Sequence, residues 1–389
     1  DLVPGSAVAA SLTTGDIVLT ALGTVSWRGD DRLLAFGHPF LQRGATSIFL
    51  HPAYIYGVVP SVELPFKVGA PAGPPVGAFV EDRAAGLGGV LGRVARSVTL
   101  SIDAGDGGLG RRRTLNVQAV LDDELAPTLL AVTIMQAMAE VMDRAGGGTA
   151  RMEWSIEGEG LAQPLRRDDL IYSANDIIGE AMPGPLFTLD ALLRNDFSLV
   201  VPKRVEVKVD VLQERRTARL IEVTCEPKTA KAGDEVTVRA RLQPYRGQPL
   251  ERNLTFRIPA DTAPGSLVVE VHGRPAAADG PLSQAVLMAR GLAPPASLDE
   301  LVRVLSSAQR GNSLSAELLT PEAANSRQQV FERLDAMPSL DLFSEEPQAL
   351  PTLGGALEVG VARPLAQAEV TLDHVVQGRL RTNLAVLAP

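Results

Sequence analysis

Turn-forming residues interrupt this sequence at short intervals along nearly its whole length. The chain has 36 glycines and 28 prolines among its 389 residues, about one residue in six. Glycine and proline terminate regular elements and form turns, so they leave few stretches in which a long helix could form. This density favours many short strands joined by turns, and it argues against a bundle of long helices.

The rest of the composition indicates a folded, acidic chain with more than one domain. A length of 389 residues suggests two or three domains, at roughly 150 residues each. Hydrophobic residues make up 45% of the chain and aromatic residues only 4%, so aliphatic side chains must fill the cores. The net charge of −9 argues against nucleic acid as a partner. No apolar run reaches about 18 residues, so we expect no transmembrane segment.

The sequence offers little chemistry for a metal or a redox cofactor. Cys225 is the only cysteine, which excludes an internal disulfide and a cysteine-based zinc cluster. It ends the strand-like run 221–225, and this position predicts a buried thiol. The four histidines show neither H-x-x-x-H nor H-E-x-x-H spacing, so a zinc hydrolase is not predicted. We expect no metal and no cofactor.

Residues 1–201 are predicted to form a β-barrel domain with a helical connector. The strand-like runs are separated by glycine, proline and aspartate, the rhythm of antiparallel hairpins, and occupy 7–12, 17–27, 32–36, 97–102 and 112–120. The period then changes. Apolar residues recur at steps of three in 125–144, which is typical of an amphipathic helix: Leu129, Val132, Met135, Met138 and Val141. Shorter helical patterns follow, so the connector covers about 126–195.

The second predicted domain covers residues 202–275. Val205, Val207 and Val209 alternate with charged residues, and four more strand-like runs follow between turns. About six to eight short strands in so few residues predict a self-contained immunoglobulin-like β-sandwich. Residues 276–389 are predicted to be a linker and a mixed C-terminal segment, with helices starting near 297 and 321 and strands at 356–361 and 383–387. The fold class is therefore mainly β.

His38 is the sharpest local feature. It follows the apolar run 32–36 and stands between Gly37 and Pro39. A histidine presented at a strand end suits a general base. A strand end is also a common place for a turn histidine that binds the backbone.

The glycines of 86–92 miss both the G-x-G-x-x-G and the P-loop spacing, so close packing of a glycine-rich hairpin is favoured over nucleotide binding.

Several short motifs, in order, resemble the SpoIVB-type (stage IV sporulation protein B) serine peptidase family. The motifs occupy 5–9, 23–25, 34–39, 77–83 and 86–89, and the resemblance covers roughly 1–125, extending in part to 195. It implies a bacterial, extracytoplasmic protein with a chymotrypsin-like or related β-barrel, and it places His38 at the position of the family's histidine. The family's nucleophile lies in a Gly-Met-Ser-Gly-Ser-Pro element, and this sequence has neither that element nor any Gly-x-Ser-Gly.

The other members of a serine triad remain alternatives on sequence alone. Ser173 is a candidate nucleophile, but its neighbours favour a helix cap. Asp82 and Asp168 are candidate acids, but Asp82 could instead pair with Arg83 or neighbouring cations, and the alternative for Asp168 is a solvated loop charge. A nucleophilic serine needs a glycine-flanked turn that aims backbone N–H groups at the oxyanion, and Ser173 lacks one.

The hypothesis that follows is a degenerate peptidase-like module that binds protein or cell-envelope partners without cleaving them. The alternative is an active serine endopeptidase with His38 as general base. The sequence begins with Asp1 rather than methionine, which fits a removed signal peptide or a fragment of a longer chain. We expect a periplasmic or secreted protein whose partners are proteins and not nucleic acids.

Overall fold

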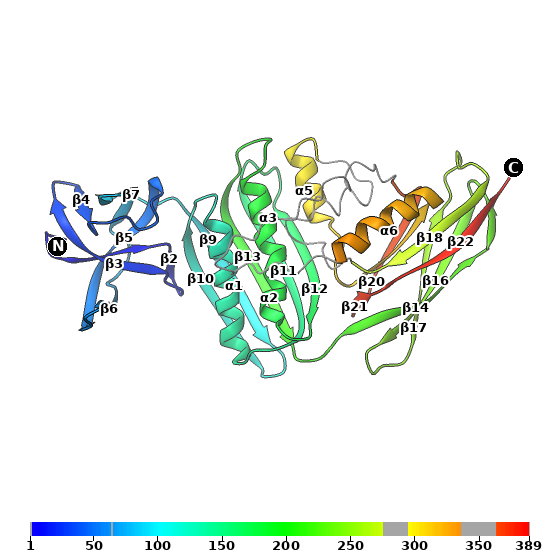
Figure 1. Ribbon diagram of the computed structural model, residues 1–389, viewed down its shortest axis with the longest axis horizontal. Helices are drawn as coiled ribbons and strands as arrows, with labels where there is room; N and C mark the ends of the chain where they lie inside the picture. The colour runs from blue at the N-terminus through cyan, green and yellow to red at the C-terminus, as the bar shows by residue number, and fades with distance from the viewer. Residues whose placement is uncertain (1, 64, 275–294, 336–362, 389) are drawn as a thin grey trace. The chain divides into compact units, whose positions relative to one another are not determined.

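The computed structural model describes residues 2–63, 65–274, 295–335 and 363–388 (Figure 1). The chain is mainly β, as predicted. It divides into two compact units. Unit 1 comprises residues 1–143, 154–166 and 188–209, and unit 2 comprises 144–153, 167–187 and 210–389. Among the described residues, no helix is both long and apolar enough to cross a membrane.

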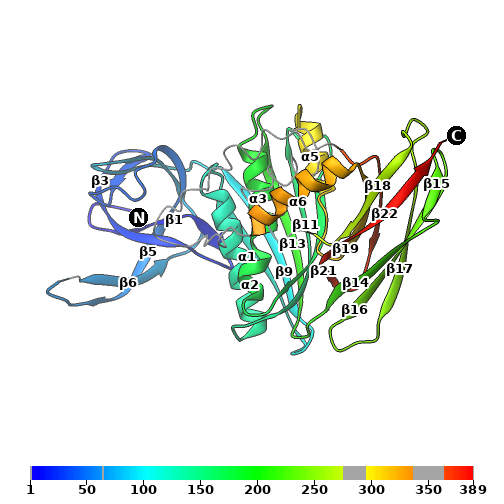
Figure 2. The same cartoon turned by 45° about the vertical axis from the view of Figure 1, so that its right-hand side comes forward.

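The N-terminal part of unit 1 is a closed six-stranded β-barrel. Its strands pair in the order β1-β3-β4-β8-β7-β5, and β5 pairs again with β1 to close the sheet. The strands are β1 (Ala7–Ser11), β3 (Thr20–Arg28), β4 (Arg32–Ala35), β5 (Gly44–Val59), β7 (Gly77–Arg83) and β8 (Gly86–Leu91). A further strand, β6 (Phe66–Pro71), pairs with the distal part of β5, and Figure 2 shows this pair projecting from the barrel.

The buried core of the barrel consists of aliphatic side chains and one phenylalanine, as the scarcity of aromatic residues predicted. The core residues are Leu2, Val8, Ala10, Val25, Leu33, Ala35, Ile48, Leu50, Phe79 and Leu87. All but the last residue of the glycine-rich run 86–92 form β8, and a Cβ added to Gly89 would lie 2.5 Å from the Leu50 Cδ1. The glycines therefore permit close packing, which confirms the prediction for this segment.

A six-stranded sheet follows, in the order β12-β11-β13-β9-β10-β2. Its strands are β2 (Thr13–Gly15), β9 (Ser97–Asp106), β10 (Arg111–Val120), β11 (Gly148–Glu159), β12 (Leu165–Ser173) and β13 (Val201–Leu212). Helix α1 (Ala126–Met142) packs on β9 and β10. The helices α2 (Ile177–Ala181) and α3 (Pro183–Leu193) precede β13.

The helix predicted over 125–144 is present, but its buried stripe differs from the predicted one. Leu130, Ile134 and Met138 are fully buried, whereas Val132 and Met135 are only half-buried. Steps of three residues cover about 300° and drift around a helix, so a core-facing stripe must mix steps of three and four. The prediction at Val132 and Met135 was wrong for this reason.

The main part of unit 2 is two sheets around one core. The first has the order β17-β16-β14-β21 and the second β15-β22-β18-β19-β20. Their strands are β14 (Thr217–Glu226), β15 (Thr229–Lys231), β16 (Glu235–Pro244), β17 (Leu250–Arg257), β18 (Gly265–His272), β19 (Ser313–Leu319), β20 (Ala366–Thr371), β21 (Val375–Gln377) and β22 (Arg379–Leu387). The helices α5 (Leu298–Ser306) and α6 (Pro321–Asp335) belong to the same unit.

The predicted boundaries of this sandwich differ from the observed ones. Strands from 313–319 and 366–387 complete it, so residues 202–275 are not self-contained and 276–389 is not a separate segment. The valine alternation of 205–209 does mark a strand, but β13 belongs to the sheet of α1. Alternation shows that one face of a strand is buried, and it does not show against which sheet. The predicted linker and the strand-like run 356–361 lie mostly or wholly outside the described residues.

Cys225 lies in the core of the sandwich, as predicted, and is 1% exposed. Burial, with a smaller contribution from the neighbouring Glu226 carboxylate, raises the pKa of the Cys225 thiol from 9.0 to about 11. The folded chain therefore keeps a proton that the unfolded chain releases at lower pH.

From this pKa we predict a pH dependence of stability. Between about pH 9 and pH 11 the unfolded state binds fewer protons than the folded state, so stability falls as pH rises, by up to about 2 kcal/mol. The measurement is urea unfolding at pH 8 and pH 10.5 for the wild type and for Cys225→Ala, which lacks the thiol. The stability of the wild type relative to the variant should decline with pH. An unchanged difference would contradict the prediction.

Candidate functional site

A sharp turn after β4 carries His38. Phe36 and Gly37 both have φ of 76°, a conformation that a phenylalanine adopts only under tertiary constraint. The Phe36 ring lies edge-on to Phe79 of the barrel core, with centroids 6.1 Å apart. It also meets the His38 ring at 5.7 Å. The turn is thus fixed by a ring that packs into the end of the barrel.

The His38 imidazole is exposed, and it hydrogen-bonds the backbone. Its Nδ1 is 2.8 Å from the carbonyl oxygen of Pro39. A carbonyl can only accept, so Nδ1 carries the proton and Nε2 is an acceptor in the neutral ring. In a serine triad the same Nδ1–H donates to a carboxylate, which orients the ring. Here a backbone carbonyl takes that place.

The Asp82 carboxylate is fully buried beside the same loop. It accepts hydrogen bonds from the backbone N–H groups of Phe40 (2.9 Å), Leu41 (2.7 Å) and Arg43 (3.4 Å). These bonds satisfy a charge that would otherwise be costly to bury. Asp82 lies on β7 and holds the backbone of the loop that contains His38, but it does not bind the imidazole.

The other two predicted residues lie in unit 2 and make local contacts. The Ser173 Oγ accepts from the N–H groups of Asp176 (3.1 Å) and Asn175 (3.4 Å). The cap of α2 is Asp176, which accepts from the Gly179 N–H at 3.0 Å, so the helix cap predicted at Ser173 lies three residues later. The Asp168 side chain is 42% exposed and pairs with Arg310 at 2.7 Å.

A buried carboxylate next to Asp168 was missed by the sequence analysis. Asp169 is 3% exposed and accepts from Arg274 at 2.6 Å and from the Gly311 N–H at 2.7 Å. Arg167 lies 3.5 Å away. The run 166–169 has two arginines followed by two aspartates, and strand alternation could have placed Arg167 and Asp169 on one face. No group of three metal-ligating side chains occurs among the described residues.

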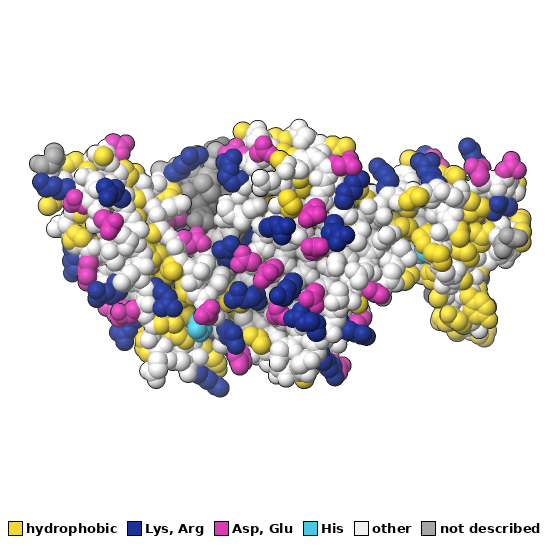
Figure 3. Space-filling model, turned by 180° about the vertical axis from the view of Figure 1, so that it is seen from behind, with side chains coloured by type: hydrophobic (Ala, Val, Ile, Leu, Met, Phe, Trp, Pro, Cys, Tyr) yellow, Lys and Arg dark blue, Asp and Glu magenta, His cyan; other side chains and the backbone are white. Residues whose placement is uncertain are grey.

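A second missed feature is the apolar ribbon, defined here as residues 53–59 of β5 and 66–71 of β6. These strands pair with each other beyond the end of the barrel. Its large side chains are exposed to solvent: Tyr54 (61%), Tyr56 (70%), Val58 (61%), Phe66 (53%) and Val68 (45%). Figure 3 shows the ribbon as the yellow lobe at lower right. The long run without charge from 44 to 62 is the sequence feature that could have revealed it.

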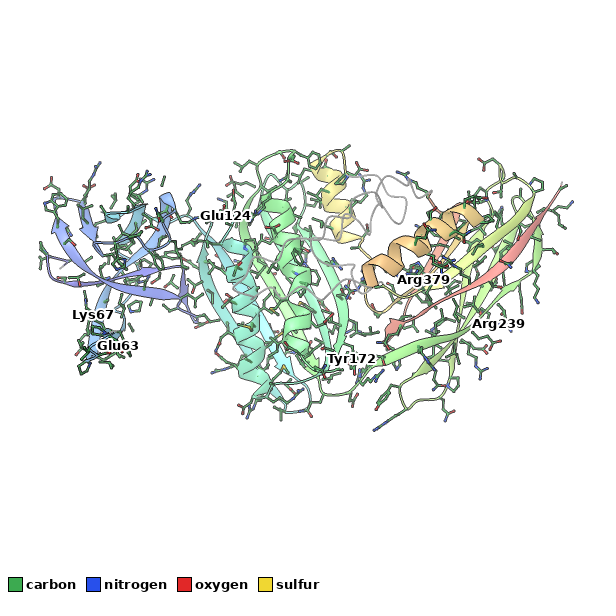
Figure 4. The ribbon with its side chains drawn as sticks, in the orientation of Figure 1. Glu63, Lys67, Glu124, Tyr172, Arg239 and Arg379 are labelled. Atoms are coloured by element: carbon green, nitrogen blue, oxygen red, sulfur yellow. The ribbon has the colours of Figure 1, made fainter. Side chains whose placement is uncertain are left out.

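One face of the apolar ribbon contacts the barrel, and the opposite face is exposed to solvent. Lys67, labelled in Figure 4, donates to the Thr24 Oγ1 of β3 at 2.7 Å. The register pairs Val59 with Phe66 and Tyr54 with Ala70, and alternation along β6 places Phe66, Val68 and Ala70 on the face opposite Lys67. The register therefore places Tyr54, Phe66 and Val68 on one face of the ribbon, and Val58, which pairs with Lys67, on the other.

Comparison with known proteins gives no match, since no protein-family model, no curated protein and no solved structure matches the chain.

The hydrogen bonds of Asp82 predict that this residue stabilises the loop that follows His38. Asp82→Ala should destabilise unit 1 by about 3 kcal/mol, because three backbone donors lose a charged acceptor. Glu81→Ala, which removes the adjacent carboxylate, whose side chain is 46% exposed and pairs with Arg83 at the surface, should cost less than about 0.5 kcal/mol. Urea unfolding measures both values, and hydrogen exchange should quicken at the Phe40 and Leu41 amides in the Asp82 variant only. Unchanged exchange at those amides would contradict this role.

Proposed function

We propose that this chain is an extracytoplasmic bacterial protein whose SpoIVB-peptidase-like barrel binds other proteins and does not cleave them. The extracytoplasmic location follows from the family resemblance, as does the proposal that the barrel is peptidase-like. An immunoglobulin-like sandwich in unit 2 is part of the same proposal and suits a role in adhesion or cell-envelope assembly.

The apolar ribbon carries the binding part of the proposal. Single exposed apolar residues are ordinary, but a contiguous patch of aromatic and aliphatic side chains is typical of an interaction surface. Tyr54 and Tyr56 lie with ring centroids 5.2 Å apart, and both are more than half exposed. Tyrosine and phenylalanine are enriched in the buried centres of protein interfaces. The structure therefore holds apolar area that a partner protein would cover.

The surroundings of His38 support the absence of cleavage. A serine peptidase needs a carboxylate on Nδ1, a serine hydroxyl at Nε2 and preorganised oxyanion donors. Nδ1 binds the Pro39 carbonyl, and Asp82 is occupied by three amides. The active endopeptidase remains the second candidate, because the exposed imidazole has an Nε2 without a hydrogen-bond partner among the described residues.

A fluorophosphonate probe tests the catalytic question. The probe reacts with activated serines, and we expect the native chain to show no more labelling than the heat-unfolded chain. We also expect no cleavage of casein by the wild type, by His38→Ala or by Ser173→Ala. A known serine peptidase supplies the positive control. Labelling or cleavage by the wild type that both substitutions abolish would establish the endopeptidase instead.

Photo-crosslinking tests the binding surface. Benzoylphenylalanine in place of Tyr56 or Phe66 should give a discrete adduct with another protein in the producing cells. The same probe in place of Arg113, a 67% exposed residue of β10, is the matched control and should give none. Failure to crosslink at both ribbon positions, or equal adducts at the control, would contradict binding through the ribbon.

A further inference from the structure

A groove on the outer surface of the barrel is a second site, with a chemistry unlike that of the apolar ribbon. It has a volume of about 840 Å³ and lies over β3, β4, β8 and β7. Four of its lining residues form one row across these strands. The register places Trp27 opposite Leu34, Leu34 opposite Gly88, and Gly88 opposite Glu81. We call this site the Trp27 groove.

Glycines shape the groove. Gly88 leaves the centre of the row open, since a Cβ there would lie 3.3 Å from the Cβ of Glu81. Gly29 supports the indole, because a Cβ on that residue would approach the Trp27 ring to 2.5 Å. Trp27 is 51% exposed and Leu34 is 52% exposed. The groove therefore offers two apolar side chains, one of them a ring held in position, beside an open floor.

The charged lining of the groove is mostly cationic. Arg83 pairs with Glu81 at 2.7 Å. The guanidinium groups of Arg32 and Arg93 have no hydrogen-bond or ion-pair partner among the described residues. Two uncompensated cations thus flank an aromatic and an aliphatic side chain, on a chain whose net charge is −9. This charge pattern is complementary to an anionic ligand that also carries an apolar group.

The dimensions of the row suit an extended peptide. Four adjacent strands span about 14 Å from the first to the last, since neighbouring strands lie about 4.8 Å apart. An extended chain advances about 3.3 Å per residue, so about four peptide residues would cross the row. A nucleic acid would require more phosphate contacts than two arginines provide, and it would leave Leu34 without an apolar partner.

We propose that the Trp27 groove binds an extended acidic segment of a partner protein. Carboxylates of the segment pair with Arg32 and Arg93, and a neighbouring apolar side chain lies against Trp27 and Leu34. Arginine suits this role because its planar guanidinium can bind a carboxylate through two hydrogen bonds. The inference deepens the proposed protein-binding function and rests on it, but it concerns a different surface from the apolar ribbon.

The test uses the full chain and a fluorescein-labelled peptide, Leu-Glu-Phe-Glu-Leu, with Leu-Gln-Phe-Gln-Leu as the uncharged comparison. Fluorescence anisotropy should show at least about tenfold weaker binding of the uncharged peptide, and of the acidic peptide to Arg32→Ala/Arg93→Ala, because charge-assisted hydrogen bonds are lost. Arg111→Ala/Arg113→Ala removes the same charge from β10 and should bind as the wild type does. Both pairs are exposed, so these variants should retain the wild-type melting temperature.

Tryptophan emission gives a second readout. Of the two tryptophans, Trp154 is 3% exposed and Trp27 is 51% exposed, so the unlabelled acidic peptide should shift the emission of Trp27 to shorter wavelength. Trp27→Phe should abolish the shift. Equal affinity for the two peptides, unchanged binding to the Arg32/Arg93 variant, or displacement by an equal concentration of single-stranded DNA would overturn the groove proposal. If that happens while the ribbon still crosslinks to a partner, the proposed function stands without the groove.

Discussion

The pairing of a single long strand, β5, determines the architecture of the N-terminal barrel. Residues 44–50 of β5 pair with β7, and residues 49–52 pair with β1, so this part of the strand has neighbours on both edges and closes the barrel. The closed barrel leaves no free strand edge. Beyond Pro52, β5 pairs with β6, and these two strands form the apolar ribbon outside the barrel. One uninterrupted strand thus produces both a stable scaffold and the exposed apolar surface.

In unit 2, buried charged side chains link elements that are distant in the sequence. Arg327 of α6 is fully buried and pairs with Glu317 of β19, and its Nη1 lies 3.8 Å from the Glu270 carboxylate of β18. Arg381 of β22 binds Glu270 at 2.6 Å. Such a cluster contributes little net stability over an apolar core, but removal of one partner leaves a costly unpaired charge. These contacts therefore favour one arrangement of α6, β18, β19 and β22, which come from distant parts of the sequence.

Local sequence patterns predicted much of the secondary structure and little of its assembly. The density of turn-forming residues predicted a mainly β chain, and the change in the spacing of apolar residues near 125 predicted α1. Both signals depend only on residues that are close in the sequence. The completion of the sandwich by β19 and β22 depends on pairing across about 40 to 120 residues, which alternation does not encode. The same division applies to the candidate site. His38 could be recognised from its local motif. The hydrogen bonds from the amides of residues 40, 41 and 43 to Asp82 could not, because they join two segments that only the fold brings together.

Residues of the motifs at 23–25, 34–39 and 77–83, on which the proposed family resemblance rests, have structural roles in the barrel. A Cβ on Gly23 would come within 2.4 Å of the Phe36 ring, so this glycine makes room for the ring that fixes the turn. Gly37 adopts the positive φ that the same turn requires, and Asp82 anchors the backbone that follows His38. A barrel that closes in this way would need these residues with or without a nucleophile. The motifs around His38 are therefore explained by the structure of this end of the barrel. Whether the chain can cleave a substrate depends on the groups that surround the imidazole.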